Sequence, residues 1–466
     1  MVFSSLEFLF LFLPVALGGY FILPRIARNG WLLATSLVFY AWGEPTFVFA
    51  MVASIVFNYA VARGIAVCRA GAWTARLLLT VGVGGDLALL GTYKYANFLT
   101  GVLRAWFPSL QGVVPQTSFL LPIGISFFTF QALSYIVDVF RRRVEAQRNP
   151  FALALYIALF PQLIAGPIVR YADICRRLAA RRETWAGVVS GLGRFLVGFN
   201  KKILLANTLA TVADRAFGEP VAGCPFAWLG AVAFSLQVYF DFSGYSDMAI
   251  GLGRMFGFAF PENFNHPYAA GTICGFWRRW HMSLTAWFRD YVYFPMGGSR
   301  VGPVRQVFNL LAVWAMTGLW HGADWTFLVW GLLWGLLIVF EKLTGIERRL
   351  QDAGACARVA YRVFTVVAIV VCPVFIRAAS LPAALSYLSS LAGLAHAPES
   401  VDQTLFWLRE DWFVFIAAIV GSLPVWRGLR GPRWAHLGFL VQLPLFAVSL
   451  VALVMKAHNP FMYFNF

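Results

Sequence analysis

The chain has 466 residues, of which 60% are hydrophobic and only 12% charged, and its formal net charge is +16. Soluble globular proteins carry about 25% charged residues, so the composition excludes an ordinary soluble enzyme and predicts an all-α polytopic membrane protein. The positive charge lies at the ends of apolar runs, as the positive-inside rule expects. No basic stretch outside these flanks is interleaved with aromatic residues, so we expect no nucleic-acid partner.

The first part of the chain alternates apolar runs with basic loops. The run Phe8–Leu23 lacks the basic segment that precedes the apolar core of a cleaved signal peptide, and Arg25 follows it. We therefore expect a retained first helix with its N-terminus outside. Further spans are predicted at Gly30–Trp42, Thr46–Ala62, Leu77–Tyr93 and Phe119–Phe140.

The segment Phe151–Val169 breaks this alternation, because basic residues flank both of its ends. Pro161 and the pair Gly166–Pro167 interrupt helical hydrogen bonding within it. A re-entrant segment satisfies both facts, and such backbone is tolerated only inside protein or beside a water-filled cavity. The prediction is a cavity open to the cytoplasm, and an ordinary span with a poor charge bias is the alternative.

The rest of the chain shows further apolar runs and no internal repeat. These runs are Ile203–Phe217, Pro225–Gly251, Val307–Trp320, Trp325–Phe340, Ala360–Ile376, Trp412–Leu423 and Leu437–Val454. With the first part they predict about eleven transmembrane helices plus re-entrant and interfacial helices, in a single domain over residues 1–466. The six cysteines form no C-x-x-C pair, so neither a zinc site nor a disulfide framework is expected.

The stretch "VYFDFSGYSDMAIGLGRMFG" places two acids in an otherwise apolar run. Asp241 and Tyr245 share one helical face, and Asp247 points elsewhere. Acids at membrane depth are usually paired with Lys or Arg, so one interpretation is that these two hold neighbouring helices together. The other is a proton path, which a proton-coupled secondary transporter would need. Many transporters carry inverted repeats, and their absence here argues against that class.

The stretch "FWRRWHMSLTAWFRDYVYFPMGG" has the periodicity of one amphipathic helix, Phe276–Gly298. Trp277, Trp280 and His281 share its apolar face, and Arg279 lies on the basic face. Such a helix prefers the membrane interface or the wall of a cavity near it. A lone histidine among tryptophans is usually structural, and a second histidine in similar surroundings makes His281 a candidate site residue.

That second histidine lies in "TGLWHGADWTFLVWG", where His321 and Asp324 separate two apolar runs. If both flanks are cytoplasmic, each arm of the hairpin rises only about 24 Å at 1.5 Å per residue, short of the roughly 30 Å hydrocarbon thickness. The turn would then lie inside the protein, where ionisable residues are costly and usually functional. The alternative is a short hairpin whose polar turn reaches water.

Two buried imidazoles suit proton transfer better than metal binding, since two histidines are too few ligands and no Cys or Glu completes a metal-ligand spacing. We therefore expect no metal. Burial keeps an imidazole neutral. A neutral imidazole can take the proton of a hydroxyl that attacks an acyl carbonyl, or can accept the acyl group itself. The residues do not separate these two roles.

Together these stretches, "FWRRWHMSLTAWFRDYVYFPMGGSR", "MTGLWHGADWTFLVWG" and "YFDFSGYSDMAIGLGRMFG", resemble the membrane-bound O-acyltransferase (MBOAT) family, and within it the AlgI-like alginate O-acetyltransferase subunits. "LPIGISFFTFQALSYIVDVFR", "FPQLIAGPIVRY" and the ending "NPFMYFNF" add to the match. The resemblance covers nearly the whole chain, and the combination of motifs makes it specific.

The resemblance implies a helical bundle around a central funnel. It assigns His321 as the catalytic base or acyl acceptor and His281 as its helper. The substrate and funnel candidates are Trp277, Arg279, Trp280, Asp241, Tyr245 and Asp324.

The resemblance also implies a reaction and partners. Acetyl would pass from a cytoplasmic thioester donor, such as acetyl-coenzyme A, across the bacterial inner membrane, with no bound cofactor. Besides membrane lipid, the partners would be periplasmic SGNH-type acetyltransferases (AlgJ- or AlgX-like) and accessory acetylation proteins, which acetylate an exopolysaccharide such as alginate. The DltB-like branch shares both histidines, so D-alanyl transfer to a cell-envelope polymer is the alternative.

Overall fold

The computed structural model describes residues 1–219, 221–395, 401–425 and 432–455. These residues form helices, turns and loops, and none of them forms a strand, as the composition predicts. The chain divides into two compact units. The first comprises Met1–Phe195 and Met248–Pro261, and the second comprises Leu196–Asp247 and Glu262–Phe466. The single domain over residues 1–466 stays a prediction.

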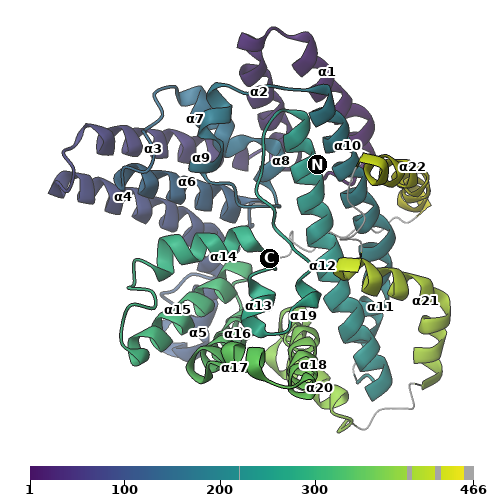
Figure 1. Ribbon diagram of the computed structural model, residues 1–466. Coiled ribbons are helices and arrows are strands. Elements are labelled where there is room, and N and C mark those ends of the chain that lie inside the picture. The colour runs from purple at the N-terminus through teal and green to yellow at the C-terminus, as the bar shows by residue number, and fades with distance from the viewer. Residues whose placement is uncertain (220, 396–400, 426–431, 456–466) are drawn as a thin grey trace. The chain divides into compact units, whose positions relative to one another are not determined.

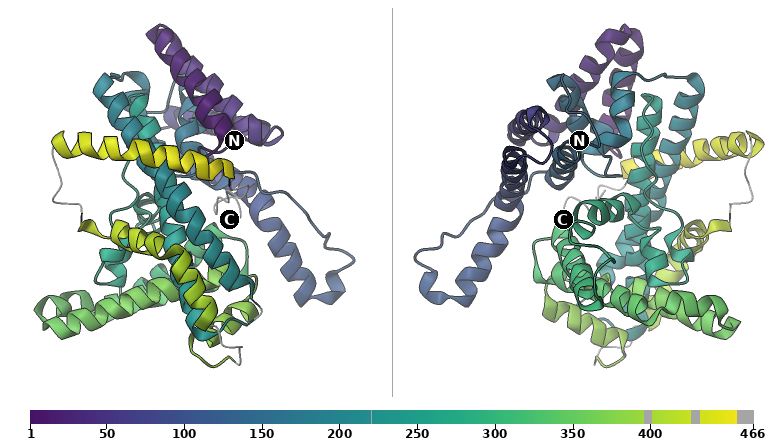
Figure 2. Two further views of the ribbon diagram at one scale, coloured as in Figure 1. Left: turned by 90° about the vertical axis from the view of Figure 1, so that its right-hand side faces the viewer. Right: turned by 60° about the vertical axis from the view of Figure 1, so that its left-hand side comes forward.

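The first unit begins with α1 (Leu13–Ile22), α2 (Arg25–Gly43), α3 (Phe47–Val67), α4 (Trp73–Leu90), α5 (Ala96–Trp106) and α6 (Ile125–Phe140). In Figure 1, α3, α4 and α6 lie side by side, and each packs against the other two. Figure 2 shows that α5 and the loop after it stand apart from the other helices of this unit, and α5 has no buried residue. The core of the unit is aromatic, with the rings of Phe8, Phe12, Phe39 and Phe160 in mutual contact.

The predicted interruption of Phe151–Val169 is present. α7 covers Pro150–Ala158 and has Leu159 as its C-cap. A second short helix, α8, covers Phe160–Leu163, and residues 164–170 are irregular up to α9 (Tyr171–Ala179). Nine helical residues rise about 14 Å, which is half of the hydrocarbon thickness of roughly 30 Å, so one continuous spanning helix is excluded. The re-entrant path of the segment through the membrane stays a prediction.

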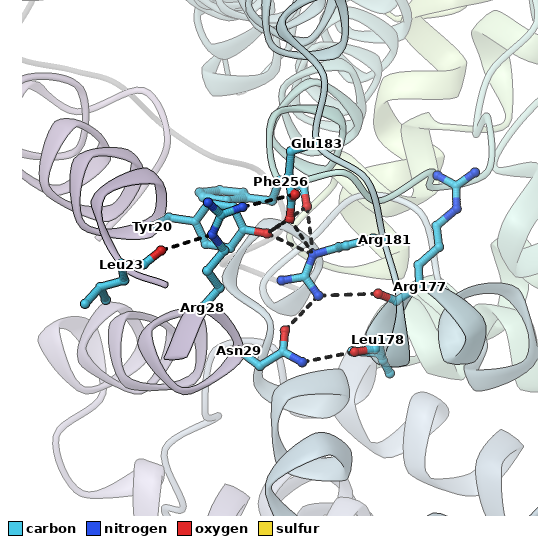
Figure 3. Close-up of polar contacts among 9 residues, drawn as sticks. All are labelled: Tyr20, Leu23, Arg28, Asn29, Arg177, Leu178, Arg181, Glu183 and Phe256. Carbon is cyan, nitrogen blue, oxygen red and sulfur yellow. Dashed lines mark hydrogen bonds and ion pairs between the residues drawn. The ribbon is translucent and has the colours of Figure 1, made fainter. Parts of the chain in front are cut away.

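A polar network at the end of α1 ties this unit together (Figure 3). The guanidinium of Arg181 donates to the hydroxyl of Tyr20 at 3.0 Å, to the carbonyl of Phe256 at 3.0 Å and to Asn29 Oδ1 at 2.7 Å. Glu183 accepts from Tyr20 and pairs with Arg28 at 3.1 Å. Burial alone would raise the pKa of Glu183, but the hydrogen bond from Tyr20 and the two arginines lower it overall. The network therefore holds an ionised carboxylate between arginines.

The second unit contains the histidine candidates. Its helices include α11 (Asn207–Gly218), α13 (Ile273–Trp277), α14 (Met282–Phe288), α15 (Pro303–His321), α16 (Trp325–Thr344), α17 (Ile346–Asp352), α18 (Ala355–Val371), α19 (Val374–Arg377), α20 (Leu381–Leu391), α21 (Val401–Ser422) and α22 (Pro432–Met455). Helices α10 (Trp185–Asn200) and α12 (Cys224–Met255) run from one unit into the other.

The protein is a multi-pass membrane protein by the length and composition of its helices. Five described helical segments are long and apolar enough to cross a bilayer, namely Phe47–Val67, Trp73–Trp106, Trp325–Thr344, Ala355–Arg377 and Gly438–Met455. Three shorter helices, Phe8–Ile22, Ile125–Phe140 and Leu381–Leu391, are also apolar. The number of about eleven spans is not confirmed.

Candidate active site

His321 lies at the end of a helical hairpin, as predicted. α15 ends at His321, Gly322 follows as its C-cap, and α16 starts at Trp325. The two arms pack tightly, because a Cβ on Gly331 would lie 2.9 Å from the Cα of Gly318 and would collide with the carbonyl of Trp314. Backbone contact between the arms thus holds His321 within a close-packed crossing.

The arms of this hairpin are not shorter than the hydrocarbon layer, so the turn depth predicted from their length is wrong. α15 and α16 contain 19 and 20 residues because they continue through the charged flanks to Pro303 and Thr344. At 1.5 Å per residue each arm measures about 28–30 Å, which matches the hydrocarbon thickness. The burial of His321 itself shows that it is recessed, since its side chain is 8% exposed.

Asp324 lies in a different environment from the buried His321. It is exposed, and its carboxylate accepts a hydrogen bond of 2.9 Å from the backbone N–H of Thr326. It is therefore the N-cap of α16, a role that stabilises the helix start. Asp324, which the sequence analysis grouped with His321, therefore caps a helix at the turn.

His281 is not in the middle of one amphipathic helix, and that prediction is wrong. α13 ends at Trp277, a turn follows, and α14 begins after His281, whose backbone is left-handed at φ 42° and ψ 53°. Left-handed backbone is uncommon for residues other than glycine, and it clusters at functional sites. The expected burial is nevertheless correct, since His281 is 1% exposed.

The imidazole of His281 lies in an apolar and aromatic environment. The ring of Phe242 contacts it edge-on at 4.6 Å, and its Nδ1 lies 3.0 Å from Oδ1 of Asn263. Its Nε2 is buried and has no hydrogen-bond partner in the described part of the protein. Burial and the nearby imidazole of His321 lower the pKa of His281 well below its usual range, so this imidazole is neutral at physiological pH.

One indole brings the two histidines together. The ring of Trp320 lies 5.8 Å from that of His281 and 4.8 Å from that of His321, measured between centroids. On its other side His321 meets Trp330 at 4.9 Å. The two histidines, 40 positions apart in the sequence and separated by α14 and most of α15, therefore contact the same aromatic ring.

The candidate residues Trp277 and Trp280 lie in the aromatic cluster near the two histidines. Trp277 is buried against Trp314, Trp330 and Trp334, with ring centroids 4.5, 6.0 and 5.2 Å away. Trp280 is half-buried and packs on Phe276. A small cavity of about 40 Å³ lies among these rings, lined by Ser235, Tyr268, Trp277, Trp280, Trp330, Trp334 and five apolar neighbours. Arg279 is half-buried, and its carbonyl accepts from the backbone N–H of Asn265 at 2.9 Å.

Asp241 and Asp247 form the ion pairs expected of acids in an apolar helix. Asp241 meets Lys202 at 2.7 Å with both side chains 3% exposed, and Asp247 meets Lys201 at 2.7 Å. The lysines belong to the π-helix Lys201–Ala206, so the pairs join α12 to that segment. Tyr245 is buried one turn further along α12.

The sequence did not single out Glu341 as a site residue, yet it organises this region. Its carboxylate is 2% exposed and accepts from the backbone N–H groups of Ile273 at 2.6 Å and Cys274 at 2.7 Å, and from the hydroxyl of Tyr361 at 2.9 Å. A carboxylate at the start of a helix is stabilised by the orphan N–H groups and the helix dipole. Glu341 thereby attaches α13, which carries Trp277, to α16.

The structure thus places two buried imidazoles against one indole, and a neutral imidazole can accept either a proton or an acyl group. Comparison with known proteins identifies the class of protein. The sequence pattern of the MBOAT, membrane-bound O-acyltransferase, family matches residues 116–378. The chain is 47% identical over 351 residues to a protein of Azotobacter vinelandii named probable alginate O-acetylase AlgI. The aligned region covers 74% of this chain and 70% of that relative.

Two other relatives extend the comparison. A peptidoglycan O-acetyltransferase of Helicobacter pylori is 36% identical over 430 residues, or 84% of this chain and 80% of that protein. A teichoic acid D-alanyltransferase of Bacillus subtilis is 28% identical over 251 residues, or 49% of this chain and 62% of that protein. The chain belongs to the membrane-bound O-acyltransferase family, and its enzymatic class is acyl transfer.

Proposed function

We propose that this protein takes an acetyl group from a cytoplasmic thioester donor, such as acetyl-coenzyme A, and passes it across the bacterial inner membrane for O-acetylation of an exopolysaccharide such as alginate. The observation that carries the proposal is the buried pair His281 and His321 in contact with the same indole of Trp320. The acetyl group and the polymer are favoured by the 47% identity to a probable alginate O-acetylase.

In the proposed chemistry His321 is the base or the acyl acceptor, and His281 assists it. With His321 as base, the oxygen of an acceptor hydroxyl attacks the thioester carbonyl and its proton moves to the imidazole. The carbon–sulfur bond then breaks, and the thiol leaves with that proton. With His321 as acceptor, its nitrogen attacks the carbonyl, the carbon–sulfur bond breaks and the thiol leaves with the imidazole proton. The hydroxyl oxygen then takes the acetyl group, and its proton returns to the imidazole. Aromatic walls exclude water, which protects the thioester from hydrolysis.

The aromatic surroundings suit a short acyl group. Trp277 and Trp280 line the small cavity beside the pair, together with Trp330, which also contacts His321. We place Trp277, Trp280 and Arg279 in the frame of the funnel. Asp241, Tyr245 and Asp324 are placed outside the chemistry, since two of them have structural partners in the ion pair and the helix cap. No bound cofactor takes part in this scheme.

The proposed partners are periplasmic SGNH-type acetyltransferases and accessory acetylation proteins, which would receive the acetyl group and place it on the polymer. They are proposed because the described residues form helices suited to a membrane and include no strand or separate soluble unit that would handle a polysaccharide.

The first test is discharge of a labelled thioester. Purified protein in nanodiscs receives acetyl-coenzyme A labelled in the acetyl group, and release or transfer of label is followed for wild type, His321→Ala and His266→Ala. We expect activity in the wild type and in the His266→Ala control, and loss in His321→Ala. Equal activity of wild type and His321→Ala would refute the assigned role of His321.

D-alanyl transfer is the second candidate, because a teichoic acid D-alanyltransferase is 28% identical over half of this chain. The same preparation is given a D-alanyl thioester on a carrier protein. Discharge of that donor without discharge of acetyl-coenzyme A would favour this branch over acetyl transfer. Uptake of protons without discharge of either donor, abolished by Asp241→Asn, would favour the transporter alternative.

A further inference from the structure

The loop before α13 holds the strained backbone of His281. The backbone N–H of Met282 donates to the carbonyl of Asn263 at 3.0 Å, and that of Asn265 donates to the carbonyl of Arg279 at 2.9 Å. These two bonds pair residues 263–265 with the turn that contains His281. The left-handed conformation at φ 42° is thus maintained by a neighbouring segment.

The side chain of Asn263 is buried at the centre of this pairing, with 1% exposure. Its Oδ1 lies 3.3 Å from the backbone nitrogen of Ser283, 2.8 Å from the hydroxyl of Ser283 and 3.0 Å from Nδ1 of His281. Its Nδ2 donates to the hydroxyl of Ser246 at 3.1 Å. Both ends of the amide therefore have partners.

These contacts determine the tautomer of His281. A backbone N–H can only donate, so the amide atom facing Ser283 N is the oxygen, which can only accept. The same oxygen faces Nδ1 of His281, so Nδ1 must carry the proton. In a neutral imidazole the other nitrogen is then an acceptor. Nε2 of His281 therefore presents a lone pair, and it is the buried atom that has no partner in the described part of the protein.

An acceptor nitrogen restricts what can bind there. The carbonyl oxygen of a thioester, or the oxyanion that forms from it, needs a donor, so Nε2 cannot stabilise either one. It can accept from a hydroxyl or an N–H group. The acyl acceptor supplies such a hydroxyl, and Trp320 places that site next to His321.

We propose that Asn263 is a positioning residue that locks His281 as the Nδ1–H tautomer, so that Nε2 of His281 receives the hydrogen bond of the hydroxyl that accepts the acyl group. The tautomer lock follows from the contacts alone, and the assignment of the bound hydroxyl rests on the proposed acyl transfer. An amide partner is neutral and does not stabilise an imidazolium as an aspartate does. A hydroxyl has a single proton, and this hydrogen bond directs it to His281, so the arrangement favours His321 as the acyl acceptor. As the oxygen attacks an acetyl group held on His321, the proton passes to Nε2 of His281 and on to the departing nitrogen of His321, which leaves His281 neutral again.

The tautomer is tested by nitrogen NMR of the whole protein in nanodiscs, with nitrogen-15 in its histidines. The signals of His281 are those that disappear in His281→Gln. We expect a protonated Nδ1 and an unprotonated Nε2 in the wild type, mixed tautomers in Asn263→Ala, and the wild-type pattern in Asn265→Ala, an exposed asparagine of the same loop. Asn263→Asp keeps an oxygen at that place and is expected to restore the protonated Nδ1. A protonated Nε2 in the wild type, or an unchanged tautomer in Asn263→Ala, would overturn the lock.

The bound hydroxyl is tested by kinetics on the same variants. A misplaced reacting group costs about 100-fold in rate, and we expect Asn263→Ala to lower kcat/KM for the acceptor by that factor while Asn265→Ala matches the wild type. Discharge of the thioester to water should fall less than transfer to a polyol acceptor. Equal loss of both reactions would contradict the assignment of Nε2 to the acceptor hydroxyl. A wild type without any thioester discharge would refute the proposed function and the bound hydroxyl together, and the NMR result on the tautomer would stand.

Discussion

At the residue scale, the charge state of His281 depends on the side chains that face it. These are Asn263, Phe242 and Trp320, which carry no charge, and the imidazole of His321. Burial and His321 both disfavour an imidazolium, so the pKa of His281 is lowered. A neutral acceptor at Nε2 thus persists to a pH below the ordinary histidine value of about 6.5.

The variant Asn263→Asp reverses this balance. An opposite charge at hydrogen-bond distance favours the protonated imidazole, so the pKa of His281 rises in the variant. As pH falls, Nε2 becomes protonated earlier and loses its lone pair. We expect the acid limb of the pH profile of acetyl transfer to move to higher pH by about one pH unit or more.

The measurement is the rate of labelled acetyl transfer between pH 5 and 9, with Asn265→Ala as the control. The alkaline side of the profile is expected to keep its position. An acid limb that stays where it is in the wild type would show that protonation of His281 does not limit the reaction.

Some residues of the candidate site can be recognised from the sequence, and others cannot. The short motifs around His281 and His321 are visible, since an ionisable residue between apolar runs is conspicuous. Asn263 is not visible, because its role depends on the pairing of residues 263–265 with residues 279–282, which no local pattern encodes. Glu341 resembles an ordinary flank charge at the end of a span, and only the tertiary structure shows the helix start that it caps.

At the element scale, Glu341 holds α13 in place through three hydrogen bonds. In Glu341→Gln an amide NH₂, which can only donate, replaces one carboxylate oxygen. It then faces a group that donated to that oxygen, either a backbone N–H or the hydroxyl of Tyr361, so at least one hydrogen bond is lost. Each hydrogen bond to a charged group contributes about 1.5–3 kcal/mol, so the free energy of unfolding should fall by about that amount or more. We expect a lower midpoint of thermal unfolding in detergent, followed by tryptophan fluorescence, together with reduced acetyl transfer.

Glu347→Gln is the matched control for this substitution. Glu347 pairs with Arg278, whose side chain is 57% exposed, and exposed ion pairs contribute about 0–1 kcal/mol. Its thermal midpoint should stay close to that of the wild type. If the two variants lose equal stability, the buried carboxylate is not what anchors α13.

The ion pair of Asp241 and Lys202 separates the two interpretations of the acids in α12. Both side chains are buried, and removal of one partner from such a pair costs about 3–5 kcal/mol, whereas replacement of both by apolar residues is often neutral. We expect Asp241→Asn to unfold at lower temperature, and the double variant Asp241→Leu with Lys202→Met to recover stability and acetyl transfer. A stable Asp241→Asn protein that lacks function would point to proton movement instead.

The sequence predicts elements better than their boundaries. Apolar runs correctly locate the arms of the α15–α16 hairpin. Both helices continue beyond these runs, through Arg305 to Pro303 in α15 and through Glu341 and Lys342 to Thr344 in α16. The periodicity of Phe276–Gly298 correctly places Trp277 and His281 among the buried side chains, but Trp280 and Arg279, predicted on opposite faces, are both half-buried. It misses the break at His281, because periodicity does not register one left-handed residue held by a distant loop.

At the scale of the whole molecule, the proposed reaction requires the donor on one side of the membrane and the polymer on the other. The positive-inside rule assigns the sides. The basic stretch "RYADICRRLAARR" is predicted to be cytoplasmic, and the loop after α5, which contains Ser109, is predicted to lie outside. Ala180 in the basic stretch and Ser109 in the loop after α5 are both exposed, so each is a suitable position for a chemical label.

Labelling of single cysteines tests this topology in a variant whose six natural cysteines are replaced. A membrane-impermeant maleimide on spheroplasts should label Ser109→Cys and spare Ala180→Cys, and inside-out vesicles should show the reverse. The same vesicles, which expose the cytoplasmic face, should consume acetyl-coenzyme A from the bulk solution, whereas sealed spheroplasts should not. Because the side of the label and the side of thioester use are measured on one preparation, agreement ties the donor to the cytoplasmic face. Labelling of Ala180→Cys in spheroplasts would invert the orientation, and thioester use from the periplasmic side alone would contradict a cytoplasmic donor.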